Sequence, residues 1–164
     1  MSSKDVTIIS IAGKQNAGKT TLLKNLIPKL KEQRYRVGTL KYNIKKFDID
    51  HEGKDTYQYS NAGADSIAIS TQSEFVVIKK TPNPLTLHEI IETQFNDVDI
   101  VLVEGYREDG YPRIRIIGSQ DTNTVKKDSE NELLLVNVKE ENSCFSADNI
   151  NRALNFIEKN MTTQ

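Results

Sequence analysis

A glycine-rich segment near the amino terminus constrains the fold more than any other part of the sequence. Residues 13–23 read GKQNAGKTTLL, and they follow the apolar run VTIISIA at residues 6–12. The segment matches the pattern G-x-x-x-x-G-K-[ST], in which the backbone curls so tightly that its N–H groups converge on phosphate oxygens. A Cβ atom at Gly13 or Gly18 would obstruct that curl. The alternative is a plain glycine-rich turn, but the strand before and the helix after favour a phosphate-binding loop.

Each part of such a loop has a chemical role in nucleotide binding. Lys19 supplies a point charge for the β- and γ-phosphates, and the Thr20 hydroxyl is a ligand for Mg²⁺. The helix that begins near Gly18 directs the positive end of its dipole at the anion. We therefore predict that the nucleotide contacts the whole segment, which comprises Gly13, Lys14, Gln15, Asn16, Ala17, Gly18, Lys19, Thr20 and Thr21.

Strand-like and helix-like segments alternate along the chain, which is typical of a parallel sheet covered by helices. Strands are predicted at residues 6–12, 36–42, 66–70, 75–79, 98–103, 113–117 and 133–138. Helices are predicted at residues 20–33, 84–95 and 146–160, the last with Ser146 as its N-cap. The predicted fold is α/β, a three-layer P-loop NTPase fold with a mostly parallel central sheet. Residues 45–61 and 105–113 are interpreted as loops, and residues 1–164 as a single nucleotide-binding domain.

Acidic residues suited to a Mg²⁺–nucleotide complex follow two of the predicted strands. Glu104 ends the apolar run IVLV, where P-loop proteins place an acidic group that reaches the Mg²⁺ shell or orients the attacking water. Asp48 and Asp50 alternate in FDID, so they share a face of an extended backbone, and a cation between them would offset their repulsion. Asp55 could cap the next helix or join the metal site. The predicted metal ligands are Thr20, Asp48, Asp50 and Glu104, and the predicted catalytic residues are Lys19, Glu104 and Asp50.

The charge balance and the apolar runs exclude other classes of protein. With 22 basic and 23 acidic side chains, the chain has no bulk charge for nucleic acid, and we expect none as a partner. No run approaches the ~20 apolar residues of a membrane helix, and the first residues lack the layout of a signal peptide. The only cysteine, Cys144, cannot form an internal disulfide. We therefore expect a cytoplasmic protein without a membrane partner.

Several motifs in sequence order resemble one family. The strings are GKQNAGKTTLL, RVGTLKY, FDIDHEGKDT, NAGAD, VDIVLVEGYRED and PRIRI, and together they resemble the molybdopterin-guanine dinucleotide biosynthesis protein B (MobB) family over about residues 8–117. The resemblance implies a weakly hydrolysing, GTP-binding P-loop protein that uses GTP and Mg²⁺ and is commonly a homodimer. It also implies a role beside the guanylyltransferase that joins GMP to molybdopterin in molybdenum cofactor biosynthesis.

The sequence departs from the family pattern after the second predicted strand. Members usually carry a histidine-rich segment there, whereas residues 41–46 read KYNIKK. Lys45 and Lys46 could meet an anionic pterin phosphate or form a solvated basic loop. Guanine preference is not readable, because NVKE at residues 137–140 lacks the aspartate of N-K-x-D. A free-standing P-loop small-molecule kinase therefore remains the alternative, although Arg107 and Arg113 are not spaced as in a lid helix.

Overall fold

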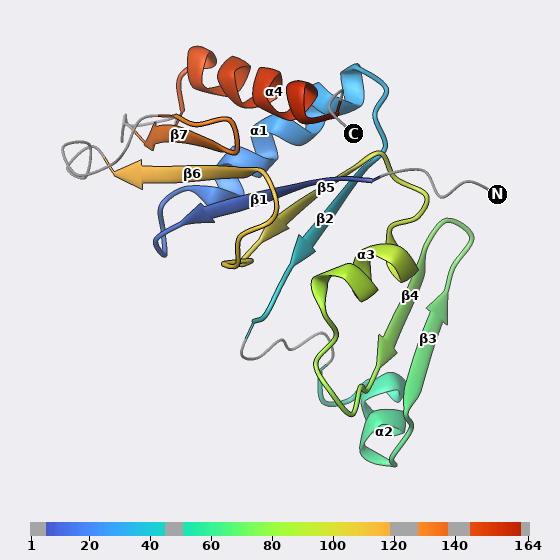
Figure 1. Cartoon of the computed structure of the whole chain (residues 1–164). Helices are drawn as coiled ribbons and strands as arrows, with labels where there is room; N and C mark the ends of the chain where they lie inside the picture. The colour runs from blue at the N-terminus through green and yellow to red at the C-terminus, as the bar shows by residue number, and fades with distance from the viewer. Residues whose placement is uncertain (1–5, 45–50, 119–127, 138–144, 162–164) are drawn as a thin grey trace. The chain divides into compact units, whose positions relative to one another are not determined.

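The computed structural model describes residues 6–44, 51–118, 128–137 and 145–161 (Figure 1). Asp48, Asp50, Cys144 and the pair Lys45 and Lys46 lie outside the described residues. The chain divides into two compact units, Met1–Asn43 with Leu87–Gln164, and Ile44–Thr86, and each unit is described separately. The assignment of residues 1–164 to a single domain stays a prediction. No helix among the described residues is long and apolar enough to cross a membrane.

The larger unit is built around a five-stranded parallel sheet. Its strands lie in the order β2-β5-β1-β6-β7, and every neighbouring pair is parallel. The bounds are β1 Thr7–Gly13, β2 Val37–Lys41, β5 Ile100–Glu104, β6 Arg113–Gly118 and β7 Glu132–Asn137. The first four residues of β5 are fully buried, as a strand at the centre of a sheet covered on both faces requires.

Helices cover both faces of this sheet, which confirms the predicted α/β fold with a mostly parallel centre. Helices α1 (Lys19–Glu32) and α4 (Ala147–Met161) pack over one face, where they share a core with Leu102. Helix α3 (Leu87–Gln94) packs over the other face with Val101 and Val103 (Figure 1). Successive side chains of a strand point to opposite faces, so β5 contributes to both cores. Ser146 caps α4 as predicted, because the Asn149 N–H donates to its Oγ at 3.2 Å.

The smaller unit contains helix α2 (Asp55–Asn61) and the strands β3 (Ser66–Ser70) and β4 (Phe75–Lys79). Both strands have the predicted bounds. However, they pair with each other in a separate antiparallel sheet and do not join the parallel sheet. The reason is the connection: residues 71–74 can close a hairpin, whereas a parallel crossover needs about a dozen residues. Residues 45–61 were predicted as a loop, and α2 occupies their last part.

Candidate nucleotide-binding site

Positive backbone angles shape the loop between β1 and α1. Gly18, the residue before α1, has φ 97°, and Asn16 has φ 60°. Glycine adopts this left-handed region most readily and asparagine tolerates it better than most residues. The Ala17 N–H donates to the Lys14 carbonyl at 3.2 Å, and this bond closes the turn. The residue types of the motif therefore produce the tight curl that the sequence predicted.

Gly13 ends β1 at a point with little room for a side chain. A Cβ atom there would lie 3.1 Å from the Ile116 carbonyl oxygen and 3.2 Å from the Ala17 Cβ. Contacts this short force a neighbour to move, and one of the two is backbone. The missing side chain therefore lets the loop turn back closely against β6.

Lys19 lies at the centre of the curl. Its ammonium donates to the carbonyl oxygens of Gly13 at 3.1 Å and Lys14 at 2.8 Å. The same Nζ lies 3.9 Å from Glu104 Oε1, and the two side chains are only 15% and 17% exposed. The structure thus brings together two residues that are 85 positions apart and that the sequence predicted as partners at one site.

The sheet register explains this meeting. In the parallel pairing of β1 with β5, Glu104 lies beside Ile11, two residues before Gly13. Both strands therefore end at the same edge of the sheet, where ligands bind in open α/β proteins. Glu104 has the place that the sequence predicted for the acidic group of a P-loop protein.

The amino end of α1 presents donors without a competing acid. The first turn contains no acidic residue, and Gly18 offers no side-chain cap. The first N–H groups of a helix have no partner within the helix, so this end favours an anion. Thr20 is exposed and Thr21 half-buried in the same turn. These features suit phosphate oxygens.

The predicted metal ligands are placed only in part. Thr20 and Glu104 lie in the larger unit, and Asp55 is the first residue of α2 in the smaller unit. Within residues 6–44, 51–118, 128–137 and 145–161, no group of three or more His, Cys, Asp or Glu side chains could hold a metal ion. Mg²⁺ coordination by Thr20, Asp48, Asp50 and Glu104 therefore stays a prediction.

Sequence reasoning missed an aromatic group behind the site. The ring of Tyr106 packs edge-on against Tyr42 at 5.8 Å and against Tyr111 at 5.6 Å between centroids. Burial raises the pKa of the Tyr106 hydroxyl above its usual 10.0, and the Glu108 carboxylate adds to the rise. The local sequence gives no signal of this group, because Tyr42 follows β2 whereas Tyr106 and Tyr111 lie in the loop between β5 and β6.

Gly105 joins this aromatic group to Glu104. The Tyr42 N–H donates to the Glu104 carbonyl at 2.8 Å, and Gly105 then turns with φ 96°. A Cβ atom on Gly105 would lie 2.5 Å from the Tyr42 carbonyl oxygen. The turn directly after Glu104 therefore requires glycine for both its angle and its space.

Known proteins resemble the chain in sequence and in fold. A sequence model of the family described as molybdopterin guanine dinucleotide synthesis protein B (MobB) matches residues 8–139. The molybdopterin-guanine dinucleotide biosynthesis adapter protein of Haemophilus influenzae is 32% identical over 114 residues, which are 68% of this chain and 64% of that protein. Its counterpart in Escherichia coli is 31% identical over 116 residues, 66% of this chain and 64% of that protein. The chain thus spans slightly less than two thirds of the length of these two relatives.

A solved structure extends the likeness over nearly the whole chain. The crystal structure of Bacillus subtilis MobB superposes with a TM-score of 0.68 at 25% identity. The superposition covers 92% of this chain and 97% of that one.

Two alanine variants separate backbone strain from steric clash in the loop after Glu104. Gly105 and Gly110 both have positive φ, but a Cβ atom on Gly110 would meet nothing within 4 Å. Gly110→Ala should lower the free energy of unfolding by about 1–2 kcal/mol through strain alone. Gly105→Ala should lower it by a further ~1–3 kcal/mol, because the Tyr42 carbonyl must move. Urea unfolding measures both, and equal losses would show that the contact with Tyr42 has no energetic weight.

Proposed function

The chain belongs to the MobB family, and on that premise we propose that it is a GTP-binding accessory protein of molybdenum cofactor biosynthesis with weak GTPase activity. The relatives in Haemophilus influenzae and Escherichia coli are named as adapter proteins of molybdopterin-guanine dinucleotide biosynthesis. The proposed partners are the guanylyltransferase that joins GMP to molybdopterin, and molybdopterin itself, in the cytoplasm. The observation that supports this proposal most directly is the position of the Lys19 ammonium within the loop of residues 13–18, where its Nζ lies 3.9 Å from Glu104 Oε1.

The geometry supports binding of a triphosphate with Mg²⁺. A bound phosphate would replace the carbonyl oxygens of Gly13 and Lys14 as the partner of the Lys19 ammonium. Charge-assisted hydrogen bonds of this kind are stronger than those to neutral acceptors. The first turn of α1 adds N–H donors, and the proposed roles of Thr20 and Glu104 are to hold Mg²⁺ and its water shell.

The same geometry favours slow hydrolysis. The two arginines of β6 are committed elsewhere: Arg113 donates to loop carbonyls and Arg115 pairs with Glu132. Neither of them is thus engaged with the P-loop, and an arginine finger is worth ~10³–10⁵ in rate. A partner that supplied such a group would switch hydrolysis on, which fits an accessory role.

The loop after Glu104 favours this reading over a small-molecule kinase. Kinases close a moving lid over the phosphates. Here Tyr106 is buried between Tyr42 and Tyr111, so residues 105–112 are tied to the sheet. A loop that is packed in this way is poorly suited to open and close in each turnover.

A homodimer is proposed from the surface of the β3–β4 hairpin. Four of its apolar side chains are exposed: Phe75 by 70%, Val77 by 48%, and Ile69 and Val76 by 43% each. Phe75 and Val77 lie on one face of the hairpin, and Ile69 and Val76 lie on the other. A two-stranded hairpin is marginally stable in water, and exposed apolar residues that lie together mark interaction sites. A second copy of the chain would cover the face of Phe75 and Val77.

Two variants of the site should fail in different ways. Lys19→Ala removes the cation beside the phosphates and should weaken Mg²⁺–GTP binding at least about a hundredfold. Glu104→Gln keeps the size of the side chain and deletes its charge, so binding should survive while hydrolysis falls about a hundredfold. Calorimetry and single-turnover hydrolysis measure the two effects. Lys24→Ala, an exposed lysine of the same helix, is the matched control and should change neither.

The accessory role is tested directly with purified guanylyltransferase, molybdopterin, GTP and Mg²⁺. Adding the wild-type chain should raise the rate at which the guanine dinucleotide is formed, and the Lys19→Ala chain should not. A wild-type chain that leaves this rate unchanged and does not bind the enzyme would contradict the role. Appearance of a phosphorylated metabolite with the chain alone would favour the kinase.

Truncation of the most exposed hairpin residue tests the dimer. Phe75→Ser should raise the dimer dissociation constant at least about tenfold, because aromatic residues dominate such interfaces. Sedimentation equilibrium measures this constant. Tyr59→Ser removes another exposed aromatic ring, from α2, and is the control. A Phe75→Ser chain that dimerises like the wild type would place the interface elsewhere.

A further inference from the structure

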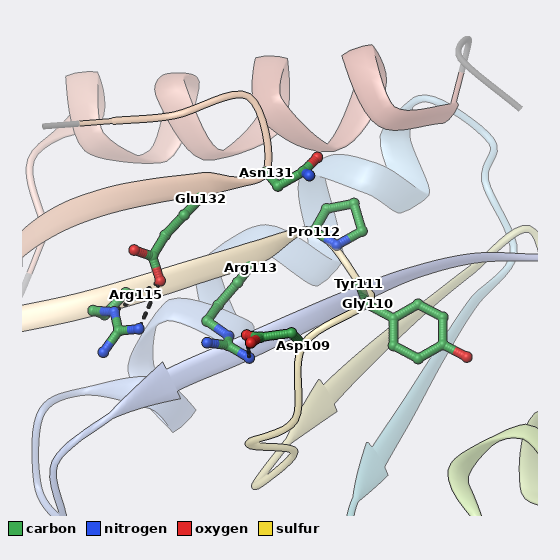
Figure 2. Close-up of a pocket in the computed structure, with 8 residues that line it drawn as sticks. All are labelled: Asp109, Gly110, Tyr111, Pro112, Arg113, Arg115, Asn131 and Glu132. Atoms are coloured by element: carbon green, nitrogen blue, oxygen red, sulfur yellow. Dashed lines mark hydrogen bonds and ion pairs between the residues drawn. The ribbon is translucent and has the colours of Figure 1, made fainter. Parts of the chain in front are cut away.

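Arg113, the first residue of β6, holds the middle of the loop that follows Glu104. Its Nη2 donates to the Glu108 carbonyl at 2.7 Å and to the Arg107 carbonyl at 3.3 Å. The same nitrogen lies 3.6 Å from Asp109 Oδ1, and Figure 2 shows the guanidinium reaching toward Asp109. The Arg113 side chain is only 13% exposed, whereas that of Asp109 is fully exposed. The two carbonyl bonds are therefore the main hold, and the ion pair is solvent-screened.

Ser10, in strand β1, binds the carbonyl of Tyr106, which directly precedes the carbonyls of Arg107 and Glu108. The Ser10 hydroxyl is buried and donates to the Tyr106 carbonyl at 3.3 Å. Ser10 and Arg113 are register partners in the pairing of β1 with β6. Neighbouring residues on two strands thus bind the three successive carbonyl groups of Tyr106, Arg107 and Glu108. We call this set of contacts the loop clamp.

Arg115 shows that the clamp is specific to Arg113. Both arginines lie on one face of β6 and line one cavity of about 400 Å³ with residues 109–112, Asn131 and Glu132 (Figure 2). Arg115 Nη2 pairs with Glu132 Oε1 at 2.7 Å, and its Nε donates to the same oxygen at 2.8 Å. The two guanidinium groups therefore have different partners within the chain, and only that of Arg113 is bound to the loop.

We propose that Arg113 is a positioning residue of the P-loop site, which acts by clamping residues 105–112 so that Glu104 is held beside Lys19. This inference rests on the proposed GTPase function. Glu104 is the last residue before the loop, and the first carbonyl of the clamp, that of Tyr106, lies only two residues after it. The clamp therefore fixes the path of the chain on the carboxyl side of Glu104, and the Tyr42 N–H holds the Glu104 carbonyl itself. Displacement of a reacting group by about 1 Å can cost ~10² in rate.

An arginine suits this position better than a lysine. All three contacts are made by Nη2, which lies at the far end of a longer side chain than a lysine ammonium and is held in the plane of the guanidinium. A lysine ammonium would keep the charge, but on a shorter and more flexible stem that reaches these acceptors less completely. Arg113→Lys should therefore fold and retain only part of the clamp.

The test compares Arg113→Ala with Arg115→Ala. Arg113→Ala should lower the single-turnover rate of GTP hydrolysis by about tenfold to a hundredfold, with the GTP dissociation constant changed less than about threefold. Amide hydrogen exchange at residues 105–111 should become faster in the same variant. Arg115→Ala should leave the rate and the exchange unchanged. Arg113→Lys should fall between wild type and alanine, and it replaces the alanine variant if that chain does not fold.

Chemical rescue separates positioning from general destabilisation. The cavity is open to solvent, so millimolar methylguanidinium can enter the space that Arg113→Ala leaves, and it should restore part of the hydrolysis rate in that variant alone. If amide hydrogen exchange at residues 105–111 is unchanged in Arg113→Ala, the loop clamp is overturned, whatever the rate of GTP hydrolysis in that variant. Faster exchange with an unchanged rate would overturn the positioning role. A wild-type chain that hydrolyses no GTP would overturn the proposed function, and this failure is distinguishable because it lies in the wild type.

Discussion

The alignment of β5, β1 and β6 is the constraint on which the rest of the site depends. Their register places Glu104 beside Ile11 and Arg113 beside Ser10. The end of β5 and the start of β6 therefore lie at nearly the same level on the two sides of β1, just before the loop that follows Gly13. A shift of one residue in β5 would turn Glu104 onto another face and break this arrangement. Dense packing of both sheet faces by three helices prevents such a shift.

The site is held together by polar contacts to the backbone more than by ion pairs. Lys19 is fixed by two carbonyls of the loop, and Arg113 by two carbonyls of the loop after Glu104. Backbone carbonyls are fixed by the fold, so they hold these cations in defined places. The Lys19–Glu104 distance of 3.9 Å is long for a direct ion pair, which leaves room for rearrangement when a phosphate enters.

The two units of the chain use apolar side chains differently. In the larger unit the β-strand residues are buried under helices, as in β5. In the smaller unit, strand β4 carries Phe75, Val76 and Val77 in exposed positions. Burial of the first kind gives the proposed nucleotide site a rigid sheet to stand on, and exposure of the second kind supports the proposal of a second copy as a partner.

Features that depend on local pattern could be predicted from the sequence. The predicted phosphate-binding loop has glycine and asparagine at positive φ, and the apolar run before Glu104 indicates a buried strand. The strands were placed within about two residues of their bounds, and the Ser146 cap was identified, because each depends on neighbouring residues. The nucleotide and metal contacts of the predicted site residues stay predictions.

Contacts between distant segments could not be predicted in this way, because they arise from the folded arrangement of the strands and loops. β3 and β4 read as ordinary sheet strands, and their short connection and pairing partners placed them in a separate hairpin. Arg113 and Arg115 are equivalent in the pattern RIRI, yet one holds a loop and the other pairs with Glu132. The alternation of a strand fixes which face a side chain occupies. The atoms that such a side chain contacts on that face depend on the register of neighbouring strands and on the path of the loops. Neither can be predicted from the local sequence.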